Sequence, residues 1–396
     1  MATAPGPVKY VIFDLDGLLL DTETLCVDVA REVLARYGKE LTHEAHKAAL
    51  GKRPLECWQA VSDLLGLPVG GAALLAESEP MLTDRWADAA LMPGALRLLQ
   101  HLHTSGVPFA IGTSTPRATF NKKMSDKPGV RSMCTVVVCG DEVPNGKPFP
   151  DVFLEAARKL GASPAECLVL EDAPSGAEAA IAAGMRVAVV PSMLELSDYP
   201  PADASCSVGV SCILPSLLAF QPQFWGLPPF SDLVHDIIPL DSIIRIRGPV
   251  VRGFGRGSKQ LGIPTANVDT TALASALSQA VTGIYAGWAS VGDSAETYKM
   301  VMSIGWNPYF KSRGQQTQKT AEPWLLHEFE KEFYGQEIRL VICAYVRPEC
   351  DFTSLEALIG RIRTDASMST VALQDGRLSG FQHDAFLSPP ALLAAA

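Results

Sequence analysis

Short apolar runs alternate with amphipathic segments over about the first 220 residues of the chain. The runs are rich in branched and aromatic side chains, which is typical of buried strands, and the segments between them repeat apolar residues at helical spacing. This alternation predicts a parallel sheet with helices on both faces. The predicted strands are residues 10–13, 109–112, 135–139, 168–170 and 187–190, and the predicted helices include residues 95–104, 150–160 and 176–183.

One long stretch shows no strand pattern. Between about residues 22 and 91 the pattern favours helices at 27–37, 44–50, 55–65 and 74–86. An all-helical insertion after the first strand would form a cap over the carboxyl edge of the sheet, where such folds bind their ligands. Residues 119–132, after the second strand, are poorly patterned and are predicted to form a loop.

The pattern changes after a segment rich in proline and apolar residues at about 222–240. Apolar stretches at 243–251, 283–291, 299–304 and 338–346 are predicted to be strands without crossover helices, which favours an antiparallel barrel. Helices are predicted near 323–333 and at 354–363, and the segment from about residue 374 is predicted to be disordered.

The predicted fold is therefore a Rossmann-like α/β domain with a helical cap, followed by an antiparallel β-barrel. We place the first domain at residues 1–230, a linker at 231–241, the second domain at 242–376 and a tail at 377–396.

Composition narrows the possible functions. The 396 residues carry a net charge of −10, which argues against nucleic acid as a partner. No apolar run is long enough to span a bilayer and no leader precedes the first strand, so a cytoplasmic enzyme is expected. The nine cysteines include no Cys-x-x-Cys pair, and we interpret them as reduced thiols.

Polar side chains follow the predicted strands of the first half. Asp14 and Asp16 come directly after the first strand, Thr113 follows the second and Asp172 follows the fourth, while Lys147 precedes the helix at 150–160. The carboxyl ends of parallel strands meet at one edge of a sheet, so these groups are expected to lie together. A carboxylate there can attack phosphorus, and carboxylates also bind Mg²⁺. Taken alone, Asp14-Leu15-Asp16-Gly17 could equally be an acidic turn.

The order of these groups resembles the four motifs of the haloacid dehalogenase superfamily of phosphatases. The resemblance covers about residues 8–225 and implies that Asp14 is the nucleophile and Asp16 the acid and base. The phosphate-binding residues it implies are Thr113, Ser114 and Lys147. The Mg²⁺ ligands it implies are Asp14, the main-chain carbonyl of Asp16, and Asp172.

Within this superfamily, residues 91–95, 171–176 and 220–228 are most similar to pseudouridine-5′-phosphatases. That branch often reads its substrate with a basic residue in the cap, which makes Lys52 and Arg53 candidates for substrate binding. The alternative is that both side chains lie at a solvated helix end.

A glycine-rich stretch at 253–259 precedes Pro264-Thr265-Ala266-Asn267 in the second half. The stretch lacks the Gly-Lys-Ser/Thr of a phosphate loop and the third glycine of a dinucleotide-binding turn. Thr265 and Asn267 are two residues apart, so on an extended backbone they point the same way. Their neutral oxygens could bind a metal that also holds phosphates.

Residues 242–366 resemble riboflavin kinases, and Pro264-Thr265-Ala266-Asn267 is the most diagnostic element. The resemblance implies a barrel that transfers the γ-phosphate of ATP to riboflavin, with Mg²⁺ held by Thr265 and Asn267 and with Glu322 as the base. Glu322 could otherwise be a first-turn acid of the helix predicted at 323–333. The implied ATP-binding residues are Gly255, Gly257, Lys259, Gly262, Pro264, Thr265 and Asn267, and the implied flavin-binding residue is Asn307.

Together the two halves resemble bifunctional FMN hydrolase/riboflavin kinases. The leading hypothesis is an enzyme that makes FMN from riboflavin and ATP in its second half and hydrolyses FMN in its first. The first half could instead hydrolyse another ester, such as pseudouridine 5′-phosphate or a sugar phosphate, or serve as a non-catalytic regulatory domain. Small molecules are the expected partners, with neither nucleic acid nor membrane.

Overall fold

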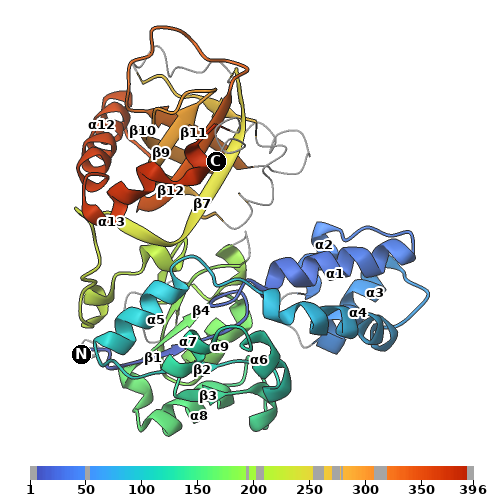
Figure 1. Cartoon of the computed structure of the whole chain (residues 1–396). Helices are drawn as coiled ribbons and strands as arrows, with labels where there is room; N and C mark the ends of the chain where they lie inside the picture. Colours follow the sequence, from blue (N-terminus) through green and yellow to red (C-terminus); the bar gives the residue numbers. More distant parts are fainter. Residues whose placement is uncertain are drawn as a thin grey trace. The chain divides into compact units, whose positions relative to one another are not determined.

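The computed structural model describes residues 7–49, 54–192, 196–201, 209–252, 263–269, 277, 280–306 and 319–389. The chain forms two compact units, Met1–Pro229 and Phe230–Ala396. Each unit has its own sheet, parallel in the first and antiparallel in the second, which confirms the predicted fold class (Figure 1). Within the described ranges, no helix combines the length and apolar character needed to cross a membrane.

The first unit is built on a six-stranded parallel sheet with strand order β3-β2-β1-β4-β5-β6. The first strand lies in the centre between β2 and β4, so Val11, Ile12 and Phe13 are fully buried. Parallel sheets are covered on both faces, which is why each strand reads as a continuous apolar run. The strands are β1 Tyr10–Phe13, β2 Phe109–Gly112, β3 Val136–Val138, β4 Cys167–Glu171, β5 Arg186–Val189 and β6 Cys212–Ile213.

Helices flank this sheet and share its core; Phe153 of α8, for example, packs in one cluster with Ile12 and Val169. They are α5 Ala95–Thr104, α6 Arg117–Lys123, α7 Pro128–Met133, α8 Asp151–Leu160 and α9 Pro174–Ala182. The loop predicted at residues 119–132 is therefore wrong. Its apolar residues are sparse because α6 and α7 are short, and Pro128 begins α7, where a missing N–H is tolerated.

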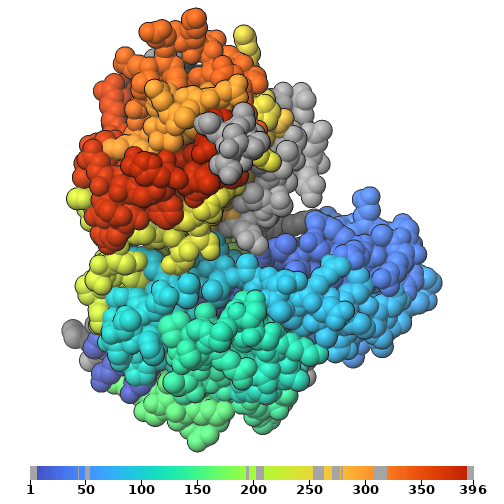
Figure 2. Space-filling model, in the orientation of Figure 1, coloured from blue at the N-terminus to red at the C-terminus, as the bar shows by residue number. Residues whose placement is uncertain are grey.

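The cap is a helical bundle inserted between β1 and α5, and Figure 2 shows it as a blue lobe. Its apolar side chains form a hydrophobic core of their own, in which Val29 and Val33 of α1 pack with Trp58 and Leu74. One connection to the sheet follows β1, and the other begins with the short helix η1 (Trp86–Asp88). The cap helices are α1 Thr22–Arg36, α2 His43–Ala49, α3 Pro54–Leu65 and α4 Gly71–Arg85.

The second unit is an antiparallel barrel with strand order β11-β10-β9-β12-β7-β8. The two edge strands also meet, because the N–H of Ala266, just before β8, donates to the carbonyl of Pro323 in β11 at 2.8 Å. The strands are β7 Ile238–Val251, β8 Asn267–Val268, β9 Gly283–Val291, β10 Tyr298–Trp306, β11 Lys319–Leu325 and β12 Glu337–Arg347.

The helix predicted near residues 323–333 is wrong. Lys319–Leu325 form β11, which pairs with β10 and places Glu322 opposite Ser303. Pro323 argued against a strand, but proline is tolerated on the edge strands of sheets. Glu322 is consequently a strand residue and not a helix-capping acid. The helix predicted at 354–363 is present as α12 Leu355–Ala372 and continues further than expected.

The disorder predicted from about residue 374 is wrong for the residues that the structure describes. Short helical turns follow α12, namely α13 Gly376–Ser379, η8 Gly380–His383 and η9 Ala385–Leu387. Leu378 and Leu387 are buried in the same core as Trp288. Arg339, which is 2% exposed, donates to the carbonyl of Leu387 at 3.1 Å. This segment, residues 376–389, is therefore a part of the barrel domain.

Candidate active sites

The first site lies at the carboxyl edge of the parallel sheet and contains a buried lysine. Lys147, in the loop before α8, places its Nζ 2.5 Å from both Asp14 Oδ1 and Glu171 Oε1, and its side chain is 6% exposed. Burial alone would lower the pKa of Lys147, but these two carboxylates raise it. A buried ammonium with such partners stays charged, so Lys147 can neutralise negative charge at this edge.

Asp14, Glu171 and Asp172 form a buried acidic group. Burial raises the pKa of Asp14 to about 7, although Lys147 opposes the shift. Burial, together with the neighbouring carboxylates Glu171 and Asp14, raises the pKa of Asp172 well above its usual value. The three side chains offer oxygens that lie within 4.8 Å of one another. Crowded carboxylates of this kind fit a hard divalent cation such as Mg²⁺, which takes oxygen ligands.

Glu171 stabilises this site through hydrogen bonds, and its oxygens are not available as metal ligands. Its Oε2 accepts the N–H groups of Asp172 and Ala173, each at 2.7 Å, while its Oε1 faces Lys147. Gly176 makes the arrangement possible, because a Cβ there would lie 1.7 Å from Oε1. Asp172 and Asp14 remain the better candidates for metal ligands.

Asp16 has its own set of partners. Its Oδ1 is 2.6 Å from Lys123 Nζ, and its Oδ2 accepts the hydroxyl of Thr115 at 2.5 Å and that of Thr113 at 3.5 Å. Burial raises the pKa of Asp16, but the lysine and the hydroxyl of Thr115 outweigh this effect and lower it. Since the carboxylate is held, only the main-chain carbonyl of Asp16 is left for a metal. Ser114 lies exposed next to Thr113.

Lys123 and Thr115 are absent from the sequence-based predictions. Lys123 lies in the segment expected to be a loop, and nothing in the sequence separates it from its exposed neighbour Lys122. A signal was present, however, because Phe120, Lys123 and Met124 have the spacing of one helix face and all three are buried. The predicted cap residues Lys52 and Arg53 lie outside the described residues.

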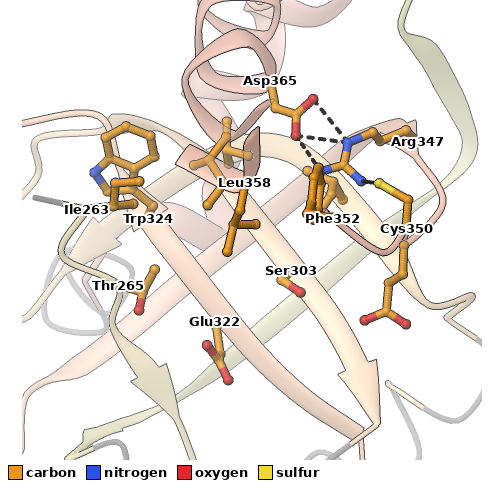
Figure 3. Close-up of a pocket in the computed structure, with 14 residues that line it drawn as sticks. Ile263, Thr265, Ser303, Glu322, Trp324, Arg347, Cys350, Phe352, Leu358 and Asp365 are labelled. Carbon is orange, nitrogen blue, oxygen red and sulfur yellow. Dashed lines mark hydrogen bonds and ion pairs between the residues drawn. The ribbon is translucent and has the colours of Figure 1, made fainter. Parts of the chain in front are cut away.

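The second site is a cavity of about 350 Å³ in the barrel. Thr265, just before β8, and Glu322 of β11 both line it, and Figure 3 shows them facing the same space with Ser303. Pro264 directly precedes Thr265 in the chain, and Asn267, two residues after Thr265, pairs with Val251 of β7. Burial raises the pKa of Glu322, which makes its carboxylate a better proton acceptor than an exposed one.

The remaining cavity wall combines apolar and charged groups that sequence reasoning did not identify. Trp324, Phe352 and Leu358 contribute apolar surface. Arg347 pairs with Asp365 at 2.8 Å, and Figure 3 shows this pair at the far end of the cavity from Glu322. Trp324 is not predicted as a cavity residue because the sequence pattern predicts a helix where the structure has β11. The predicted residues Gly255, Gly257, Lys259, Gly262 and Asn307 lie outside the described residues.

Comparison with known proteins supports both halves. A family model described as riboflavin kinase matches residues 240–373, and one described as haloacid dehalogenase-like hydrolase matches residues 11–190. The chain is 41% identical over 379 residues to the bifunctional riboflavin kinase/FMN phosphatase of Arabidopsis thaliana, and the alignment covers 96% of each chain.

Two further relatives each match a part of the chain. The chain is 40% identical to (DL)-glycerol-3-phosphatase 2 of Arabidopsis thaliana, over 57% of this chain and 95% of that one. It is 53% identical to the riboflavin kinase of Homo sapiens, over 30% of this chain and 74% of that one. The resemblances to haloacid dehalogenase-like hydrolases, to riboflavin kinases and to the bifunctional enzymes are confirmed, and the chain belongs to the family of bifunctional riboflavin kinase/FMN phosphatases.

Proposed function

We propose that the second unit phosphorylates riboflavin with ATP and that the first unit hydrolyses the product, FMN. The observation that carries this proposal is the 41% identity along 96% of both chains to a protein of that name. The partners are then riboflavin, FMN and ATP. A cytoplasmic location is in keeping with Cys134, Cys139, Cys167 and Cys343, which are buried free thiols.

In the kinase reaction, Glu322 takes the proton of the riboflavin 5′-hydroxyl as that oxygen attacks the γ-phosphorus of ATP, and the bond from the γ-phosphorus to the bridging oxygen breaks to release ADP. The raised pKa of Glu322 suits it to this role. Thr265 and Asn267 would hold Mg²⁺, which when bound neutralises charge on the transferred phosphate. The aromatic side chains of Trp324 and Phe352 line the cavity and suit the flat ring system of a flavin.

In the phosphatase reaction, Asp14 attacks phosphorus, the ester bond breaks, and the protonated form of Asp16 gives its proton to the leaving oxygen. Asp16 then takes a proton from the water that hydrolyses the aspartyl phosphate, and Asp14 is restored. Lys147 orients Asp14 and offsets negative charge on the phosphate. Asp14 and Asp172, with the Asp16 carbonyl, would hold the Mg²⁺ that reduces repulsion between Asp14 and a phosphate dianion.

One other compound is a specific candidate for the substrate of the phosphatase. The 40% identity to a glycerol-3-phosphatase, over 95% of that protein, is nearly as high as the identity to the bifunctional relative. Glycerol 3-phosphate is therefore the second candidate, ahead of pseudouridine 5′-phosphate. A regulatory role without catalysis is disfavoured by the complete set of buried groups around Asp14.

The test is a substrate panel on the full-length chain carrying Glu322→Ala, so that FMN is not remade during the assay. We expect the highest phosphatase kcat/KM for FMN, and its loss on adding Asp14→Asn. Turnover of glycerol 3-phosphate with FMN untouched would overturn the substrate assignment. Kinase turnover is measured in parallel on Asp14→Asn alone, which should phosphorylate riboflavin normally, whereas kinase activity that survives Glu322→Ala would refute the base.

A further inference from the structure

A second buried lysine stands in the phosphatase site, at the end of α6. Lys123 is 4% exposed. Its Nζ is 2.6 Å from Asp16 Oδ1 and donates to Thr115 Oγ1 at 3.1 Å, while Thr115 itself donates to Asp16 Oδ2. Both oxygens of the Asp16 carboxylate are thus held by the segment that follows β2.

Each of the two buried lysines pairs with a different aspartate of the site. Lys147 pairs with Asp14, and Lys123 pairs with Asp16, although the two carboxylates are only two residues apart in the chain. Burying an ammonium group is costly unless a carboxylate pairs with it. Each aspartate therefore stabilises the charge of its buried lysine, and each lysine in turn stabilises the charge of its aspartate. The attacking group and the proton-transferring group are consequently oriented by different cations.

Lys123 also contacts the cap connection. Its Nζ lies 4.3 Å from the centre of the Trp86 indole ring, which is within the range of a cation–π interaction. Trp86 begins η1, which links the last cap helix to the sheet domain. One turn further along, Lys127 Nζ donates to the carbonyl of Ala87 at 2.8 Å. The cap connection and the Asp16 carboxylate therefore meet on one side chain.

We propose that Lys123 is a positioning residue of the phosphatase reaction, which aims the Asp16 carboxylate at the leaving oxygen and takes its own position from Trp86. The inference rests on the role proposed above for Asp16. Proton transfer needs the protonated carboxyl group of Asp16 within hydrogen-bond reach of the leaving oxygen, so a carboxyl group that can rotate away loses efficiency. A lysine that only stabilised the fold would have no such effect on proton transfer.

The leaving group separates these two roles. An alkyl phosphate (FMN, or glycerol 3-phosphate if the chain prefers it) expels a poor leaving group that must be protonated, whereas p-nitrophenyl phosphate expels a good one that need not be. For Lys123→Met in the full-length chain we expect kcat/KM to fall about 100-fold for the alkyl ester and at most about threefold for the aryl ester. Lys123→Arg should recover much of the loss.

Two reference variants make the outcomes distinct. Lys127→Met loses a contact with the cap connection but none with Asp16, so both substrates should be affected equally. Asp16→Asn should show the same dependence on leaving group as Lys123→Met. If it does and Lys123→Met behaves like Lys127→Met, only the role of Lys123 is overturned. If Asp16→Asn slows both substrates alike, the proposed role of Asp16 fails, and the proposal for Lys123 falls with it.

The contact with Trp86 has its own measurement. Trp86→Phe keeps an aromatic face and should leave the ratio of the two kcat/KM values near that of the unmodified chain. Trp86→Ala should shift the ratio in the direction seen for Lys123→Met, and the double variant should lose no more than Lys123→Met alone, because both changes release one lysine. Additive losses would show that Trp86 does not act through Lys123.

Discussion

Replacing Leu378 with alanine tests whether the residues after α12 belong to the barrel core. Leu378 is 1% exposed and packs in one cluster with Trp288 and Val341, whereas a disordered tail would leave it in water. The indole N–H of Trp288 also donates to the carbonyl of Leu378 at 3.2 Å, which fixes the position of the residue.

The expected cost follows from this burial. A buried leucine truncated to alanine loses the transfer free energy of the removed carbons and leaves a cavity, which together amount to about 2–5 kcal/mol. We expect about 3 kcal/mol, because α13 is short and can close part of the space. With a urea dependence of about 2 kcal/mol per M, the unfolding midpoint of the barrel should fall by roughly 1.5 M.

The assay uses the full-length chain and its two activities. Samples are held in urea, and kinase and phosphatase turnover are then measured separately. The kinase midpoint should fall, while the phosphatase midpoint should not, because Leu378 lies outside residues 1–229. Val371→Ala on α12 is the matched control, since this side chain is 44% exposed and its loss should cost less than about 0.5 kcal/mol.

Two results would contradict this reasoning. Equal kinase midpoints for the Leu378 and Val371 variants would mean that Leu378 does not pack in the core. A matching fall in both activities would mean that the two units unfold together, so that the loss could not be assigned to the barrel.

Three other predictions follow from the same structure. Gly17→Ala should reduce phosphatase activity at least about 100-fold without affecting the kinase, because Gly17 has φ +84° and its Cβ would lie 2.2 Å from Asp172 Oδ2; Gly129→Ala, which meets open space, should be silent in the same assay. Lys147→Met should lower the unfolding free energy of the first unit by about 3–5 kcal/mol, since two buried carboxylates lose their cation. Urea titrations followed by circular dichroism measure this loss, with kinase turnover marking the separate transition of the second unit, and an unchanged midpoint of the first unit would contradict the ion pairs. The folded pKa of Glu322 is raised above the ordinary 4.5, so its contribution to stability is fully present below that value and is lost as the pH rises through the folded pKa. Glu322→Gln should remove this dependence from thermal melts across the acid range, and identical pH profiles for the two proteins would refute it.

Residues next to strong strand signals were the easiest to place from sequence. Asp14 directly follows the apolar run of β1 and Thr113 follows that of β2, so the sheet edge could be inferred from chain order alone. Lys123 could not be inferred in this way, because its burial depends on a tryptophan and an aspartate that lie far away in the chain. The wrong prediction of a helix at Pro323 has a related cause. A proline is tolerated in β11 because this strand lies at the edge of the sheet order, which the sequence does not show. The roles of Lys52, Arg53 and the glycine-rich stretch remain predictions.

The packing of residues 376–389 against the barrel has a consequence for the folding of the newly synthesised chain. Its contacts join residues far apart in the chain: 48 residues separate Arg339 from Leu387, 90 separate Trp288 from Leu378, and 139 separate Arg245 from Asp384. Closing such large loops costs entropy before the contacts form, and folding slows as sequence separation grows. The barrel core cannot be completed until the residues around 387 have been synthesised, and until then its apolar strands stay open to other chains. The yield of soluble protein should therefore depend on how quickly this last segment docks, and coexpression with a chaperone should help most at that step.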